Sequence, residues 1–108
     1  MDEKEYLILT IRHRDQLFGG DVHLFWGKDS SGYTAILQRA GLYTKEKAYQ
    51  IGDKDDIPIH YSEFGFEKEF FETDESFIQM PTLYSKSERS KNIIADWQYE
   101  LRHKKVMS

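Results

Sequence analysis

The sequence predicts an α+β domain: a small antiparallel sheet of three or four strands, a short helix, and a C-terminal amphipathic helix packed on the sheet. Two observations lead to this prediction. Apolar residues recur at a period of two in the N-terminal part of the chain, as in strands, and at helical spacing near the C-terminus. Because 108 residues suit one modest core, we expect residues 1–108 to form a single domain.

The first strands form a predicted β-meander. Residues 6–14 are rich in aliphatic and β-branched side chains, and residues 21–27 alternate apolar with other side chains. The segment KDSSG at 28–32 gathers turn-forming residues, and the strand pattern resumes at 33–37. Three antiparallel strands joined by turns are the simplest arrangement of these segments.

A short helix and an edge strand are expected next. Thr44 stands where an N-cap belongs, so we expect a helix over 45–51 that ends at Gly52. Residues 56–61 have strand periodicity, but Pro58 has no N–H to donate, which places them at an edge of the sheet.

Two further helices are predicted toward the C-terminus. The middle segment, residues 62–72, is expected to be partly helical with Ser62 as the candidate cap, followed by loop or extended chain at 73–84. Ser85 and Glu88 match a capping box for the last helix. Its apolar stripe, which should face the core, comprises Ile93, Ile94, Trp97 and Leu101.

Composition excludes several classes of site. The chain has no cysteine, which removes disulfides, thiolate nucleophiles and cysteine-based metal sites. No apolar stretch approaches the roughly 18–20 residues that span a bilayer, so we expect no membrane association. The acidic N-terminus MDEKEY does not look like a secretory signal, and the cytoplasm is the expected location.

Motifs that carry catalysis or hold cofactors are missing from the sequence. There is no phosphate-binding loop of the Walker type, no Gly-x-Ser-x-Gly, no His-Glu-x-x-His and no EF-hand loop. The four histidines are scattered. We therefore predict a protein that is not an enzyme, and assign no catalytic residue, no metal ligand and no cofactor.

Acidic charge is concentrated in the middle of the chain. The net charge is -4, yet residues 53–83 contain nine acidic and two basic side chains, with phenylalanines between the acids. Carboxylates steer a basic partner and an exposed ring can anchor it. This favours protein binding by Glu63, Glu67, Glu69, Glu72, Asp74, Glu75 and Phe77. The alternative is that the rings belong to the core and the acids only solvate its outer face.

The turn at 28–32 is a second candidate site. Lys28, Ser30, Ser31 and the neighbouring Tyr33 offer donors and a ring to a small ligand or nucleotide. The alternative is that these residues only make the turn between two strands. Direct binding of nucleic acid is disfavoured by the overall acidity.

A pattern in the first half of the chain resembles a family of small bacteriophage and prophage proteins. It consists of Phe25-Trp26, Gly32-Tyr33-Thr34, Ala40-Gly41-x-Tyr43-Thr44 and the segment DDIPI, and covers about residues 24–60. The turn departs from the family, which often has an Arg-Pro-Asn-like sequence where this chain has residues 27–31. The pattern has no established catalytic residue to transfer.

This resemblance implies a small accessory protein of the bacterial host cytoplasm. Such proteins bind a host protein and inhibit or redirect it, and a defence nuclease with a basic groove is one such target, as for anti-CRISPR proteins. A homodimer is left open. The residues of the pattern also suit structural tasks: Trp26 and Tyr33 can meet across the hairpin, Tyr43 can pack beneath the short helix, and Thr44 can cap it.

Overall fold

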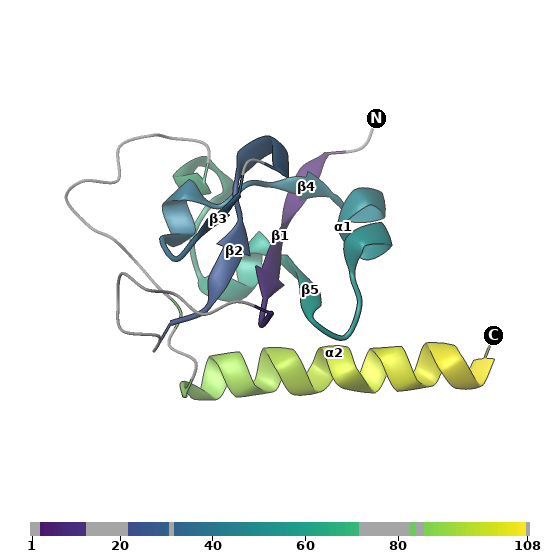
Figure 1. Ribbon diagram of the computed structural model, residues 1–108. Helices are drawn as coiled ribbons and strands as arrows, with labels where there is room; N and C mark the ends of the chain where they lie inside the picture. Colours follow the sequence, from purple (N-terminus) through teal and green to yellow (C-terminus); the bar gives the residue numbers. More distant parts are fainter. Residues whose placement is uncertain (1–2, 13–21, 31, 72–82, 84–85, 108) are drawn as a thin grey trace.

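The computed structural model describes residues 3–12, 22–30, 32–71, 83 and 86–107. Within them the chain has the predicted α+β fold, with one antiparallel sheet of five strands and two α-helices (Figure 1). Five strands is one more than the upper end of the prediction. The strands are β1 (Lys4–Thr10), β2 (Leu24–Trp26), β3 (Tyr33–Thr34), β4 (Tyr43–Thr44) and β5 (Asp56–His60).

Strand β1 is the centre of the sheet. It pairs antiparallel with β5 along residues 6–10, with β2 near its C-terminal end and with β4 near its N-terminal end. Strand β3 pairs with β2, so the predicted meander is confirmed. Strand β5 pairs only with β1 among the described residues, and its Pro58 lies opposite Ile8, as expected for an edge strand.

The first helix follows the prediction. Helix α1 spans Lys45–Ile51, the Thr44 Oγ1 accepts a hydrogen bond of 3.1 Å from the Lys47 N–H, and the Gly52 N–H closes the last turn on the Ala48 carbonyl. Capping by threonine satisfies an amide that the first turn leaves without a partner.

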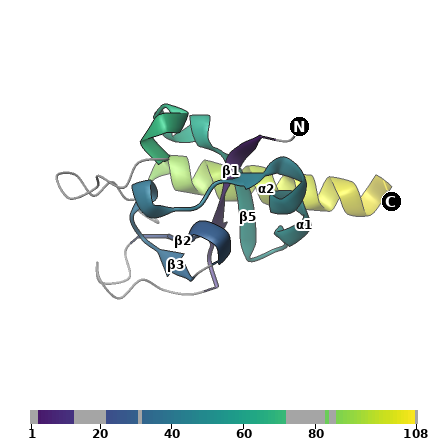
Figure 2. The same cartoon turned by 90° about the horizontal axis from the view of Figure 1, so that it is seen from above.

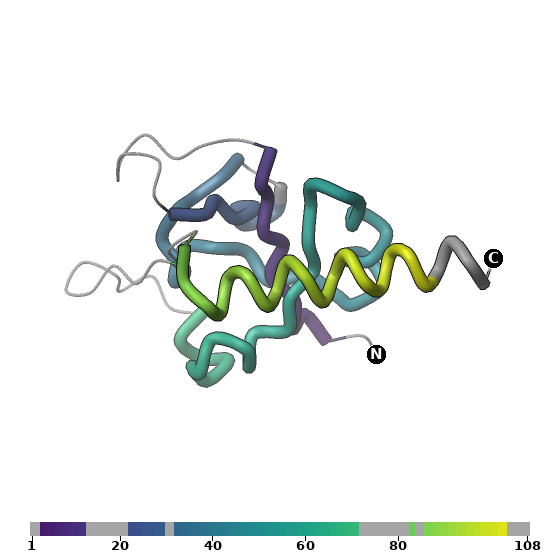
Figure 3. Tube along the Cα trace, turned by 90° about the horizontal axis from the view of Figure 1, so that it is seen from below, coloured from purple at the N-terminus to yellow at the C-terminus, as the bar shows by residue number. Residues whose placement is uncertain are grey.

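The last helix begins slightly later than predicted. Helix α2 spans Glu88–Met107, and the Ser87 Oγ accepts a hydrogen bond of 3.1 Å from the Ser90 N–H. The cap is therefore Ser87, with Glu88 as the first helical residue; the proposed cap Ser85 lies outside the described residues. Seen from the side and from below, α2 runs crosswise beneath β1 and β5 (Figures 1 and 3).

Two segments differ from the prediction. The strand predicted at 33–37 stops at Thr34, whose Oγ1 accepts a hydrogen bond of 3.2 Å from the Ile36 N–H, and the chain turns into a 3-10 helix at Leu37–Arg39. Such a bond between a side chain and nearby backbone competes with a strand ladder. The loop KDSSG likewise contains a 3-10 turn at Lys28–Ser30.

The described part of the middle segment, residues 62–71, forms no continuous helix from Ser62. The chain instead forms two 3-10 turns, Tyr61–Phe64 and Lys68–Phe71, because Gly65 adopts a left-handed φ of 78° that ends the first turn. Ser62 is not the cap, since the His60 Nδ1 accepts the Ser62 N–H at 3.3 Å. Seen from above, these turns lie on the other side of β1 from β2 and β3 (Figure 2).

The core lies between the sheet, the two 3-10 turns and α2. Its buried cluster combines aliphatic side chains of the central strands with rings, as the high aromatic content predicts. Phe25 and Phe71 are almost completely buried, and Trp97 of α2 is 4 % exposed. The apolar stripe of α2 is confirmed, because Ile93, Ile94 and Leu101 pack against this same cluster.

Candidate functional site

A groove with acidic and aromatic walls lies between β5 and α2. Its volume is about 760 Å³, and it is bounded by the edge strand on one side and by residues 89–100 of α2 on the other. The polar and aromatic residues that line it are Tyr6, Tyr49, His60, Glu63, Arg89, Asn92, Asp96, Trp97, Tyr99 and Glu100. We call it the β5–α2 groove.

Edge-on ring contacts and one hydrogen bond hold the aromatic wall of the groove in place. The Trp97 Nε1 donates a hydrogen bond of 2.7 Å to the Asp53 carbonyl, which holds the indole against the loop that precedes β5. Tyr49 lies edge-on to Trp97 with 5.7 Å between ring centres, and edge-on to Tyr6 with 5.8 Å. Tyr99 is 55 % exposed at the rim, where its ring packs on His103 with 4.3 Å between ring centres.

The carboxylates of the groove make it electrostatically negative. Glu63, Asp96 and Glu100 line it against Arg89, and all four residues are exposed. The pKa of Tyr49 is raised by burial and, to a smaller degree, by the negative charge of Glu100 and by Tyr6. Carboxylates next to ring faces favour cations, above all the guanidinium group of arginine.

The acidic segment predicted to bind protein is only partly brought to this groove. Glu63, Glu67 and Glu69 are exposed, but only Glu63 lines the groove. Glu72, Asp74, Glu75 and Phe77 lie outside the described residues.

The described rings of that segment are core or half-buried rather than exposed anchors. Phe64 and Phe71 are buried at 4 % and 1 %, and Phe66 stacks on Phe70 with 4.0 Å between ring centres. These rings therefore follow the alternative interpretation, in which aromatic side chains form core and the acids face solvent.

The turn at 28–32 contributes two residues to a different hollow, of which Lys28 is the one predicted as a ligand contact. Lys28 and Asp29 line a space of about 470 Å³ together with Lys4, Leu42, Lys68 and Phe71. Tyr33 is not part of it, because it lies edge-on to Trp26 at 6.2 Å across the hairpin, as the sequence predicted. The Ser30 side chain and Ser31 lie outside what the structure describes.

A third polar cluster joins the end of β1 to the start of β5. The Arg12 guanidinium contacts the buried Asp56 Oδ2 at 2.7 Å, and the Trp26 Nε1 donates to Asp56 Oδ1 at 3.3 Å. Burial raises the pKa of Asp53, but backbone N–H groups of Asp55 and Asp56 and the Arg12 charge outweigh this and leave it below its ordinary value. These groups fix the loop that receives Trp97, so we regard the cluster as structural.

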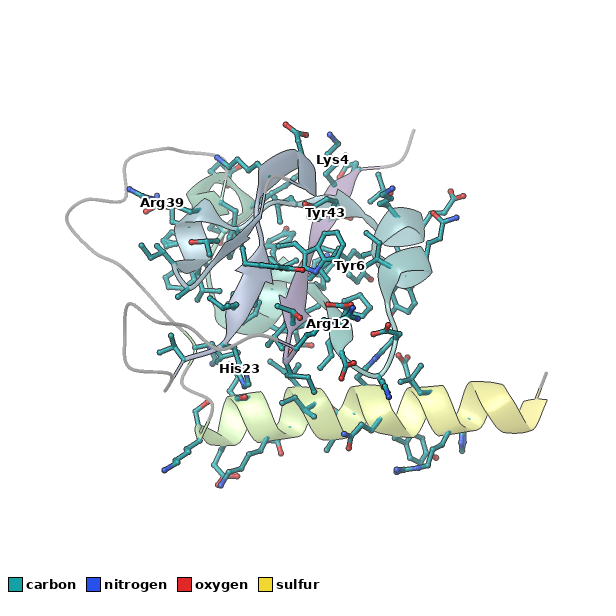
Figure 4. The ribbon with its side chains drawn as sticks, viewed as in Figure 1. Lys4, Tyr6, Arg12, His23, Arg39 and Tyr43 are labelled. Carbon is teal, nitrogen blue, oxygen red and sulfur yellow. The ribbon has the colours of Figure 1, made fainter. Side chains whose placement is uncertain are left out.

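His23 and Ser90 form a hydrogen-bonded pair of the residue types that occur in catalytic sites, but the pair is not accessible to a substrate. The His23 Nε2 and Ser90 Oγ are 2.6 Å apart, and burial lowers the pKa of His23. Ser90, however, has no exposed surface, so a substrate carbonyl cannot reach its oxygen. Figure 4 shows His23 beside α2, where the pair ties the chain before β2 to the helix.

The sequence missed most of the groove. None of Tyr6, Tyr49, Asp96 and Glu100 is among the site residues predicted from the sequence. Asp96 and Glu100 are four residues apart on a helix, which places both on one face and is the only local signal that could have joined them.

Among the described residues no group of three histidine, cysteine, aspartate or glutamate side chains could hold a metal ion. None of the helices in the described part of the chain is long and apolar enough to cross a membrane. Comparisons of the chain with protein families, with curated proteins and with solved structures found no match.

Proposed function

We propose that the protein is a small non-enzymatic accessory protein of phage type, which binds a basic segment of a host protein in the β5–α2 groove and inhibits or redirects that protein. The observation that carries the proposal is the convergence of three carboxylates and three tyrosine rings on one groove between β5 and α2. Only one of these six residues, Glu63, belongs to the acidic segment that suggested protein binding from the sequence.

The groove has the chemistry that a basic segment requires. Carboxylates pair with guanidinium or ammonium groups, and the exposed Tyr99 ring offers a face for a cation. Because Glu63, Asp96 and Glu100 are exposed, they contribute more to the rate of association than to the final affinity. The rigid Trp97 and Tyr49 rings need little ordering when a partner binds, which lowers the entropic cost.

The identity of the partner class rests on the sequence pattern and on charge. The resemblance of residues 24–60 to phage and prophage proteins supports a host target in the bacterial cytoplasm. Host defence nucleases bind nucleic acid through basic surfaces. An acidic groove competes for such a surface, so a defence nuclease is the target that we favour.

Charge reversal in two matched sets tests the proposal. The first variant carries Glu63→Lys and Glu100→Lys in the groove; the control carries Glu67→Lys and Glu69→Lys, which change the net charge equally outside it. Both are to be compared with wild type by affinity capture from a bacterial lysate, and then by association kinetics with the captured protein at low and high salt.

We expect the groove variant to associate about tenfold more slowly at low salt, with a weaker salt dependence, while the control changes little. Circular dichroism must show that both variants are folded. Equal losses in the two variants would mean that overall charge drives binding, and unchanged rates in both would exclude the groove.

A further inference from the structure

The charged residues of α2 that line the β5–α2 groove lie in a fixed order along the helix. Arg89, Asp96 and Glu100 all line the groove, and all three are exposed. At about 100° per residue, these positions lie within roughly 40° of one another around the helix axis, so their side chains leave α2 along one line. The groove therefore presents a cation near the start of α2 and two carboxylates further along it.

The spacing of these charges sets the distances that a ligand has to match. With a rise of about 1.5 Å per residue, Asp96 lies about 6 Å from Glu100 and about 10 Å from Arg89 along the helix axis. Residues two apart in an extended chain are about 6.6 Å apart. Two basic side chains separated by one residue therefore suit the two carboxylates, and an acidic side chain about three or four residues further along the segment reaches the arginine.

Arg89 disfavours a ligand that is basic along its whole length. A third cation at that end of the groove meets a like charge, whereas an acidic side chain there gains an ion pair. Glu63, on the opposite wall, adds a third carboxylate, so the ligand still has to be basic overall. Each exposed pair contributes little by itself, but an ordered set of charges discriminates between ligands of the same composition.

We propose that the β5–α2 groove selects an extended protein segment of mixed charge, with two basic side chains against Asp96 and Glu100 and an acidic side chain against Arg89. This inference rests on the proposed function and adds to it the order of charges along the partner's segment. A second copy of this chain suits the groove less well, because a chain with net charge -4 repels another copy.

Four synthetic heptapeptides with blocked ends test the order of charges. Three of them carry arginine at the first and third positions and either glutamate, glutamine or lysine at the seventh, with threonine elsewhere. The fourth has the composition of the glutamate peptide, but its glutamate and its second arginine are exchanged. Binding to wild type is measured by titration calorimetry at about 50 mM and about 500 mM sodium chloride, which differ in screening.

We expect the glutamate peptide to bind most tightly at low salt, by about threefold over the glutamine peptide and about tenfold over the lysine peptide. The rearranged peptide should bind about threefold more weakly or worse, although its net charge is the same. The higher salt concentration should reduce these differences, because they arise between exposed charges.

A charge reversal locates the effect at Arg89. Arg89→Glu should reverse the preference, so that the lysine peptide binds more tightly than the glutamate peptide. Lys91→Glu makes the same change of charge at an exposed position of α2 that does not line the groove, and should leave the preference as in wild type. Circular dichroism checks that both variants are folded, and the comparison of peptides on wild type does not depend on the variants.

Five results would overturn the proposal. They are no binding of any peptide, equal binding of the glutamate and lysine peptides, equal changes of preference in Lys91→Glu and Arg89→Glu, tighter binding of the linear polycation spermidine than of every peptide, and a wild-type dimer that Glu100→Lys dissociates.

Failure of the charge order is distinguishable from failure of the proposed function. Peptides that bind wild type equally, but lose binding to the variant with Glu63→Lys and Glu100→Lys, would remove the charge order and leave the groove as a site for basic segments. Peptide binding that is unchanged in that variant would contradict both.

Discussion

Replacing Trp97 by alanine tests how α2 is held on the sheet. The indole is 4 % exposed, donates a hydrogen bond of 2.7 Å to the Asp53 carbonyl and lies edge-on to Tyr49. It also lies so close to Gly52 that a methyl group there would come within 2.9 Å of the ring. Trp97→Ala therefore removes a buried contact between α2 and the loop that precedes β5.

The expected loss of stability follows from burial. A buried tryptophan removes about 150–250 Å² from water, worth roughly 4–6 kcal/mol at about 25 cal/mol per Å². Relaxation around the cavity reduces this, and measured values for Trp→Ala in cores are about 3–5 kcal/mol. For a chain of 108 residues this corresponds to a fall in Tm of about 13–20 °C.

Thermal and urea unfolding, followed by circular dichroism, would measure this loss. Trp97→Phe keeps a ring but not the N–H, so it should lose about 1–3 kcal/mol, from the missing hydrogen bond and the smaller ring. Tyr99→Ala, an exposed ring two positions further along, should lose less than about 0.5 kcal/mol and is the control. If the alanine variants at 97 and 99 unfold at the same midpoint, the described docking of α2 is incorrect.

Two other predictions concern a titration and a close backbone contact. Because burial lowers the pKa of His23, the unfolded chain binds more protons below about pH 6.5, and stability should fall as pH decreases from there through the folded pKa. His23→Gln should flatten the dependence of the unfolding free energy on pH between about 5 and 7; an unchanged slope would contradict this. At Gly41 a methyl group would lie 2.6 Å from the Gly27 carbonyl oxygen, so Gly41→Ala should cost about 1–3 kcal/mol in urea unfolding, and a wild-type midpoint would disprove the contact.

The parts of the fold that the sequence predicts are those with local causes. Thr44 caps α1 because its hydroxyl reaches an amide three residues on, and Trp26 meets Tyr33 because a short turn sets the register. Pro58 marks an edge strand because it lacks an N–H. In each case the atoms that determine the local structure belong to one residue or to residues close together in the sequence.

The middle segment shows why local pattern can fail. Residues 62–72 contain rings at helical spacing, but Gly65 takes a left-handed conformation and Phe64 and Phe71 both turn into the core. Two short turns bury both rings. A single helix could bury them only by presenting both on one face. Tertiary packing therefore determined the local structure. Helix propensity alone does not take tertiary packing into account.

The β5–α2 groove and the hollow beside the 28–30 turn both depend on contacts distant in sequence. The groove joins Tyr6 and Tyr49 to Glu100, and the hollow joins Lys4 to Lys68. No spacing in the sequence relates such residues, because they meet only when β1 takes its central place between the other elements. The charge count of residues 53–83 pointed to an acidic surface, and the structure places one of those acids, Glu63, in the groove.

The opposite charges that line the groove give a way to separate local effects from unfolding. Glu63→Lys with Glu100→Lys removes attraction for a peptide that carries only basic side chains, whereas Arg89→Glu adds attraction for the same peptide. Charge therefore weakens the binding of the lysine peptide in the first variant and strengthens it in the second. A loss of that binding in both variants cannot come from charge at the groove, because charge acts in opposite directions in the two, and it must come from damage to the fold.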